Sequence, residues 1–184
     1  WKPTLVILRI SRAATQVKWS PNEDKFAVAS GHRCISVCYF EEDNDWWVSK
    51  HIKKHKSTVT TLAWAPDNLL LATGSTDFKA RVFSTFIRGV DKRPTGSPFG
   101  TKLPFGELLW EKAVPGWVHD VCWSPNGDSI AYVAHDGSIN FATFPGEGQE
   151  AQVQTIPGQG LPFRSVQYLD ASTVVAAGHD CNPH

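Results

Sequence analysis

Several histidine, aspartate and cysteine side chains have the types and spacing that could support catalysis or metal binding. His135-Asp136 and His179-Asp180 are two neighbouring pairs of potential acids, bases or ligands. Cys34 and Cys38 are four residues apart in a segment with strand character. Their Cα atoms would lie about 13 Å apart at roughly 3.3 Å per residue, which is too far for one zinc ion. We therefore predict no metal site.

Motifs for catalysis or cofactor binding are missing from the sequence. It contains no nucleophile elbow, no phosphate-binding glycine loop and no His-Glu-x-x-His segment. The two His-Asp pairs fall at equivalent turns of a repeat, where hydrogen bonding accounts for them. The sequence thus predicts a protein that is not an enzyme, with no catalytic residue and no cofactor.

An internal repeat organises the chain. Its core is an apolar residue, any residue, Trp, a small residue and Pro. The copies are Val17–Pro21, Leu62–Pro66 and Val121–Pro125, with a weaker one at Val166–Asp170. The anchors Trp19, Trp64, Trp123 and Tyr168 are spaced by 45, 59 and 45 residues. A polar turn residue follows the anchors of the later copies at twelve or thirteen residues, namely Asp77, Asp136 and Asp180.

Each repeat predicts four short strands, one of them ending at the Trp-x-Pro turn, where proline stops a strand. The second strands are predicted at Lys25–Ala29, Leu69–Thr73, Ser129–Ala134 and Thr173–Ala177. The outer strands are predicted at Lys2–Leu8, Trp47–Ile52, Leu108–Ala113 and Ala151–Ile156. Four strands per period of about 45 residues are typical of a β-propeller blade of the WD type.

The fold class is therefore all-β, a WD-repeat β-propeller with about four blades of a seven-bladed ring. We expect residues 1–184 to form one partial propeller domain of a longer protein, because four repeats do not close a ring. His55 stands where a WD repeat carries a histidine that bonds the turn aspartate, here Asp77. The longer spacing before Trp123 indicates a loop insertion over residues 84–106.

Three segments are candidates for protein binding. Phe99 and Phe105 lie in Pro-Phe-Gly units of the insertion, which either binds a partner or folds back on the propeller. Lys53 and Lys54 belong to a basic run that either meets an acidic peptide or is a solvated strand edge. Trp46 and Trp47 follow acidic residues on an outer strand. At least one of them should pack between blades, and the other could be an exposed interface anchor.

Composition narrows the partners. The 184 residues are 41% hydrophobic and 20% charged, with 18 basic and 18 acidic side chains. A balanced charge does not favour nucleic acid, whose phosphates require a basic excess. No apolar run is long enough for a membrane span. Four cysteines and the lack of an Asn-x-Ser/Thr acceptor fit a reducing intracellular compartment.

Tracts outside the repeat core carry a specific resemblance. They are Trp1–Ile10, Cys38–Lys54, Pro104–Leu108, Gly116–His119 and Val175–Cys181. Together they closely resemble the WD-repeat subunit (subunit 1) of the actin-related protein 2/3 complex, along the whole chain. The resemblance implies a seven-bladed, non-catalytic scaffold that supports nucleation of branched actin filaments. Its implied partners are the other subunits of the complex, actin filaments and nucleation-promoting factors, in the cytoplasm and its actin-rich structures. The alternative is a WD-repeat adaptor of another intracellular complex.

Overall fold

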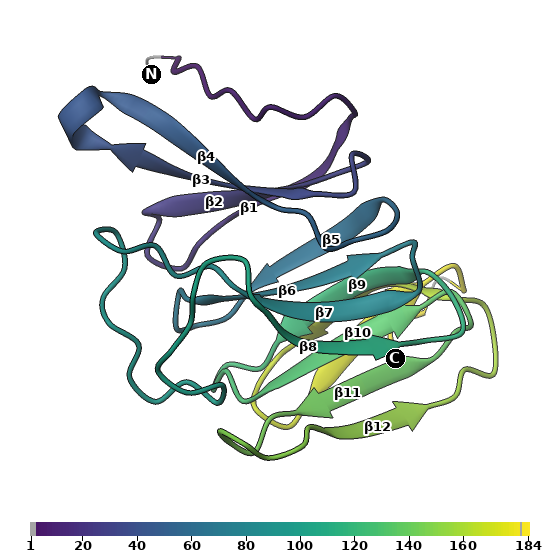
Figure 1. The fold of residues 1–184 in the computed structure, drawn as a ribbon. Coiled ribbons are helices and arrows are strands. Elements are labelled where there is room, and N and C mark those ends of the chain that lie inside the picture. The colour runs from purple at the N-terminus through teal and green to yellow at the C-terminus, as the bar shows by residue number, and fades with distance from the viewer. Residues whose placement is uncertain (1–2, 181) are drawn as a thin grey trace.

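The chain folds into antiparallel sheets that follow one another along the sequence. A computed structural model describes residues 3–180 and 182–184. In this part of the chain there are fourteen strands and one short 3-10 helix, η1 (Glu42–Asn44). Each sheet is a simple meander, and the sheets lie face to face in chain order (Figure 1).

Three of the sheets in the described residues have four strands and the last has two. The first blade contains β1 (Ala14–Trp19), β2 (Lys25–Ser30), β3 (Ile35–Glu41) and β4 (Trp46–Ile52). The second blade contains β5 (Val59–Trp64), β6 (Leu70–Ser75), β7 (Lys79–Ser84) and β8 (Leu108–Ala113). The third blade contains β9 (Val118–Trp123), β10 (Ser129–Ala134), β11 (Ile139–Thr143) and β12 (Gln152–Ile156). The fourth sheet contains β13 (Phe163–Tyr168) and β14 (Val174–Gly178). The predicted fold class, blades of a WD-repeat propeller, is confirmed.

The repeat encodes two turns per blade through backbone conformation. Four residues after the first three anchors the backbone is left-handed, at Glu23, Asn68 and Gly127, with φ of 59°, 68° and 74°. Fourteen residues after the same anchors it is left-handed again, at Arg33, Phe78 and Gly137, with φ of 60°, 66° and 81°. Glycine takes this conformation most easily, so a larger residue there carries a conformational cost.

The outer strands pair with the blade that precedes them in the sequence. β4 pairs with β3, β8 with β7 and β12 with β11. The prediction of a strand over Lys2–Leu8 was wrong, because residues 3–10 are irregular. Lys2 itself lies outside the described residues. An outer strand needs the third strand of a preceding blade as its partner, and none lies among the described residues. The carbonyl of Leu8 instead accepts bonds from Ser36 and His51 side chains, at 3.1 and 2.8 Å.

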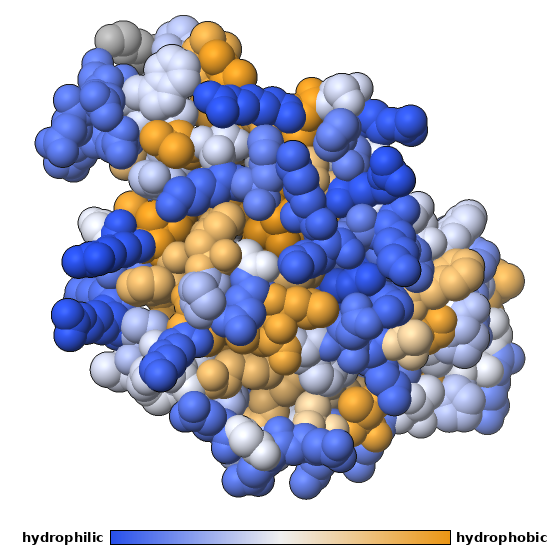
Figure 2. Space-filling view, viewed as in Figure 1, coloured by the Kyte–Doolittle hydropathy of each residue, from blue (hydrophilic) through white to orange (hydrophobic). Residues whose placement is uncertain are grey.

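The hydrophobic core lies between the sheets. Ile35, Val37 and Ile52 of the first blade pack on Leu62 and Phe83 of the second. A second cluster joins the second and third blades, and a smaller one joins the third blade to the fourth sheet. On the face shown in Figure 2, apolar surface gathers in the middle of the molecule and polar surface forms its margins. In the described part of the chain, no helix has the length and apolar character that crossing a bilayer requires.

Candidate protein-interaction surfaces

The inner strands are joined by contacts that recur from blade to blade. The indole Nε1 of Trp64 donates to the carbonyl of Lys18 at 3.0 Å. One blade further on, Nε1 of Trp123 donates to the carbonyl of Ala63 at 3.1 Å. Each anchor therefore bonds the residue that precedes the previous anchor. The tryptophan repeat positions neighbouring blades as well as ending a strand.

A polar layer lies beside these anchors. Asp120 accepts bonds from the Thr61 hydroxyl at 2.8 Å, the Ser165 hydroxyl at 2.9 Å and the Val166 amide at 3.1 Å. These donors come from the blades on both sides. The carboxylate of Asp120 is thus fully engaged in joining blades. It lines a groove of about 590 Å³ along the inner strands, together with the anchor aromatics.

His55 and Asp77 lie close together, with an arginine bridging them. His55 Nδ1 is 3.4 Å from Asp77 Oδ2, and Arg81 Nη1 lies 2.6 Å from that nitrogen and 2.8 Å from that oxygen. The other imidazole nitrogen of His55 contacts the Thr73 hydroxyl at 2.9 Å. Burial lowers the pKa of His55, and this effect outweighs the raising effect of the nearby Asp77 carboxylate. A neutral imidazole that accepts from Arg81 and donates to Thr73 satisfies all three groups.

The Asp77 carboxylate is held in its ionised form by the same cluster. Burial would raise its pKa, but contacts with His55, the Lys56 amide and Arg81 outweigh burial and hold the pKa well below the usual range. The equivalent turn residues of later repeats are more exposed. Asp136 accepts from the Ser138 amide and hydroxyl at 3.1 and 2.6 Å, and Asp180 contacts His184. In each case the local turn accounts for the aspartate.

Trp46 and Trp47 face different surroundings. The ring of Trp47 packs in an aromatic cluster, with centroids 5.1 Å from Phe26, 5.6 Å from Phe40 and 6.0 Å from Trp19. Trp46 is 45% exposed. The pair therefore combines one packed ring with one ring that is open to a partner.

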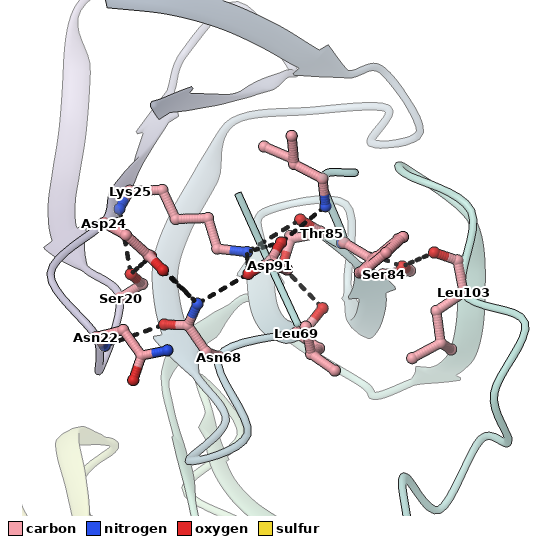
Figure 3. Close-up of polar contacts among 12 residues, drawn as sticks. Ser20, Asn22, Asp24, Lys25, Asn68, Leu69, Ser84, Thr85, Asp91 and Leu103 are labelled. Atoms are coloured by element: carbon pink, nitrogen blue, oxygen red, sulfur yellow. Dashed lines mark hydrogen bonds and ion pairs between the residues drawn. The ribbon is translucent and has the colours of Figure 1, made fainter. Parts of the chain in front are cut away.

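The first half of the insertion is tied to the first blade by a buried ion pair. Lys25 Nζ contacts both carboxylate oxygens of Asp91 at 2.6 Å and the Thr85 carbonyl at 3.2 Å (Figure 3). Asn68 donates from its amide to Asp91 at 2.9 Å and to Asp24 at 3.1 Å. Burial lowers the pKa of Lys25 against the opposing effect of Asp91. The network closes the junction between the first and second blades.

The second half of the insertion folds back onto the blades. Phe99 packs on Phe144 with centroids 4.9 Å apart, and Phe105 is partly buried against the core between the first two blades. Lys50 Nζ lies 5.5 Å from the Phe105 ring centroid. Ser84 donates to the Leu103 carbonyl at 2.9 Å. Both phenylalanines therefore contribute to packing, and their faces are half-covered.

The basic run ends on the surface. Lys53 and Lys54 are exposed in the connection between β4 and β5. The structure thus separates the candidates into an open group, Trp46 with these two lysines, and a packed group of Trp47, Phe99 and Phe105. Cys34 and Cys38 are free and buried, and the described residues hold no cluster of three His, Cys, Asp or Glu side chains placed for a metal ion.

Sequence reasoning missed Lys25, Asp91 and Arg81. One signal was available for Lys25, because it occupies the first position of a strand where the other blades carry Leu70 and Ser129. Charge at a position that is otherwise apolar or small indicates a buried partner. Nothing local identifies Asp91 as that partner.

The blades, anchors and turns define a protein of the WD-repeat β-propeller class. A family model described as "WD domain, G-beta repeat" matches residues 46–84 and 111–141. A Xenopus laevis protein, "Actin-related protein 2/3 complex subunit 1A-B", is 54% identical over the whole chain and 50% of its own length. "Actin-related protein 2/3 complex subunit 1" of Schizosaccharomyces pombe is 50% identical over the whole chain and 49% of its length. "Actin-related protein 2/3 complex subunit 1A" of Arabidopsis thaliana is 49% identical over the whole chain and 48% of its length.

The chain belongs to this subunit 1 family of WD-repeat proteins. It spans about half the length of the curated relatives it matches. The resemblance predicted from the tracts outside the repeat core is confirmed.

Proposed function

We propose that the protein is a non-catalytic scaffold subunit of the actin-related protein 2/3 complex and supports nucleation of branched actin filaments. The observation that carries this proposal is identity of 49–54% along the entire chain to relatives from a frog, a fission yeast and a plant that are all named as subunit 1 of that complex. The tracts on which the resemblance was drawn include exposed residues such as Trp46, Lys53 and Lys54, which the propeller fold itself does not require.

A scaffold role agrees with the way the polar groups are used. Asp120 joins three blades, and the His55, Asp77 and Arg81 cluster holds a turn. These groups serve one another and the backbone, whereas a catalytic group must be poised toward a substrate. The rigid blades leave surface side chains such as Trp46 to meet partners.

The exposure of Trp19 supports a larger ring. Trp64 and Trp123 each donate to the preceding inner strand, whereas Trp19 is 54% exposed and has no such acceptor among the described residues. We infer that a further blade covers Trp19 in a seven-bladed propeller. The other subunits of the complex, actin filaments and nucleation-promoting factors are the proposed partners, in the cytoplasm at actin-rich structures.

Affinity purification of the tagged intact protein tests the proposal. The expected result is stoichiometric recovery of two actin-related proteins together with further small subunits. A complex reconstituted with the protein should form branches that are visible by fluorescence microscopy, and a complex lacking it should form few. Recovery of a different stable set of partners without actin-related proteins would contradict the proposal and favour an adaptor of another complex.

Surface variants refine the same experiment. Lys53→Glu with Lys54→Glu, and separately Trp46→Ala, alter the open candidate residues without touching the core. Lys92→Glu is a matched control, because Lys92 is exposed in the insertion. If the open residues meet partners, their variants should reduce the recovered subunits or the branching rate while the control leaves both unchanged.

A further inference from the structure

A small basic cleft lies at the junction of the first and second blades, at the end opposite the Trp-x-Pro turns. Its volume is about 280 Å³. It is lined by Arg12, Gly31, Arg33, Lys56, Ser57 and Thr58. Arg12 lies just before β1, and Gly31 and Arg33 lie in the turn between β2 and β3. The other three residues lie in the segment before β5. Neither the repeat nor the scaffold role accounts for three cations gathered there.

The three cationic groups are free of acidic partners. None of the ion pairs in the described part of the chain includes Arg12, Arg33 or Lys56, and no acidic residue lines the cleft. Asp77 lies beside the cleft and accepts a bond from the Lys56 backbone amide at 2.8 Å. Its charge is already met by Arg81, also at 2.8 Å. The cleft therefore keeps a positive potential that an anion can use.

Hydroxyl donors complete the lining. Ser57 Oγ accepts a bond from the Thr76 hydroxyl at 2.7 Å, which leaves the Ser57 proton free to donate. Thr58, a second hydroxyl-bearing residue, also lines the cleft. Guanidinium, ammonium and hydroxyl groups are the donors that proteins use for phosphate oxygens.

The backbone that carries these groups is held in place before any ligand arrives. The Gly31 amide donates to the Ala13 carbonyl at 3.0 Å, and the Thr76 amide donates to the Thr58 carbonyl at 3.0 Å. Across the junction, the Thr15 hydroxyl donates to the Val59 carbonyl at 2.6 Å. Arg33 occupies the left-handed turn position where the third blade has Gly137. Glycine adopts this backbone conformation more easily than arginine, so the arginine side chain is kept there at a conformational cost. Pre-organisation of this kind favours specific binding.

We propose that this cleft binds the phosphate group of a phosphorylated serine or threonine on a partner polypeptide. A phosphate monoester carries nearly two negative charges and three acceptor oxygens, which match three cations and the Ser57 hydroxyl better than the single charge of a carboxylate does. The volume suits one such group and not a nucleotide. The cleft gathers three cations, fewer than the roughly four to eight Lys or Arg of segments that recognise anionic lipids, which favours a single phosphate group on a polypeptide. Recognition of phosphorylated segments by arginine clusters is a general binding mode.

Fluorescence anisotropy on the intact protein tests the proposal. The probes are a fluorescein-labelled pool of peptides with a central phosphothreonine and degenerate flanks, and matched pools with threonine or glutamate. We expect the phosphothreonine pool to bind at least tenfold tighter than either other pool, with displacement by inorganic phosphate. Arg12→Gln and Arg33→Gln should each weaken binding at least tenfold, and Lys56→Gln gives a third, independent substitution. Arg93→Gln, which removes an exposed arginine of the insertion, should leave binding unchanged.

Each contrary outcome overturns the proposal. Equal binding of the glutamate pool would make the cleft a general acidic-peptide site. Tighter binding to vesicles containing phosphoinositide, lost in the same variants, would make it a lipid site. If all three variants unfold like the parent protein and still bind the phosphothreonine pool, the phosphate binds elsewhere on the protein. If the parent protein shows no binding at millimolar probe, the cleft is not a phosphate site.

Discussion

The Lys25 ammonium nitrogen lies 2.6 Å from both carboxylate oxygens of Asp91, and both side chains are closed to solvent, at 0% and 1% exposure. The pair joins the first strand position of β2 to the insertion after β7. Asp91→Asn should therefore destabilise the protein by about 3–5 kcal/mol, because it leaves a buried ammonium without its counter-charge. Urea unfolding of the intact protein measures the free-energy change.

The control for this prediction is the pair Lys79–Glu111, which is about one-third exposed. Lys79→Gln should cost no more than about 1 kcal/mol, as expected for a surface ion pair. Equal effects of the two substitutions would mean that the Lys25–Asp91 contact does not hold the insertion in place.

The stability of the protein should fall as the pH is lowered from about 7 to about 5. Burial depresses the pKa of His55 in the folded state, so the unfolded chain binds a proton more readily in this range. A depressed pKa contributes stability above the unfolded value near 6.5, and this contribution is lost as the pH falls toward the folded pKa. One histidine gives a slope of at most about 1.4 kcal/mol per pH unit.

Urea unfolding at several pH values separates the sources of this slope. His55→Gln should flatten it. Burial and the neighbouring His135 also lower the pKa of His119, so His119→Gln should remove a separate share of the slope. Asp77 acts in a different range, because its depressed pKa affects stability only below about pH 4. A slope unchanged by His55→Gln would show that the pKa of this imidazole is not lowered in the folded protein.

Much of the fold could be predicted because the repeat is written in local sequence. The strands predicted at Leu108–Ala113 and Ser129–Ala134 have the observed bounds of β8 and β10. Periodic apolar residues and a proline stop act within a few residues, so a single repeat reveals them. The strand expected over Lys2–Leu8 was wrong because pairing depends on a neighbouring strand and not on the segment itself.

The contacts that define the surfaces lie beyond such local reasoning. Lys25 and Asp91 are 66 residues apart, and Arg81 reaches His55 from 26 residues away. Likewise, only the folded chain shows that Phe99 lies on Phe144. The sequence identifies which side chains are unusual, and three-dimensional packing decides which of them meet.

Trp46 and Trp47 should respond differently to truncation. Trp47→Ala removes a partly buried ring from an aromatic cluster and should cost about 2–3 kcal/mol, at or below the lower end for a buried tryptophan. Trp46→Ala should change stability by less than about 0.5 kcal/mol, because that side chain is 45% exposed. Thermal and urea unfolding compare the two. If Trp46→Ala also proved strongly destabilising, its role would be in packing and not in partner binding.

Gly74 allows close approach of the second and third blades. A Cβ at this position would lie 2.5 Å from Val118 Cγ1 and 2.7 Å from Thr61 Cγ2. Gly74→Ala should therefore cost about 1–3 kcal/mol through overpacking. Gly160→Ala is the control, because a Cβ there meets no atom within 4 Å. In a double-mutant cycle, Val118→Ala should relieve part of the Gly74→Ala penalty, and strictly additive effects would place the strain elsewhere.

Trp19 and Trp123 together test whether a further blade closes on the first. Trp123 is 7% exposed and donates to the Ala63 carbonyl, so Trp123→Phe should cost about 1–3 kcal/mol by removing a large packed ring and leaving a partly buried acceptor unpaired. If a preceding blade covers Trp19 in the intact protein, Trp19→Phe should cost a similar amount, although Trp19 is 54% exposed in this structure. If nothing covers it, the cost should stay below about 0.5 kcal/mol. Urea unfolding gives both free-energy changes. The difference in acrylamide quenching between the parent protein and each variant shows whether solvent reaches the indole that was replaced. A quenchable, dispensable Trp19 would contradict the closed ring, because a neighbouring blade would cover much of the indole and accept its hydrogen bond, as for Trp123.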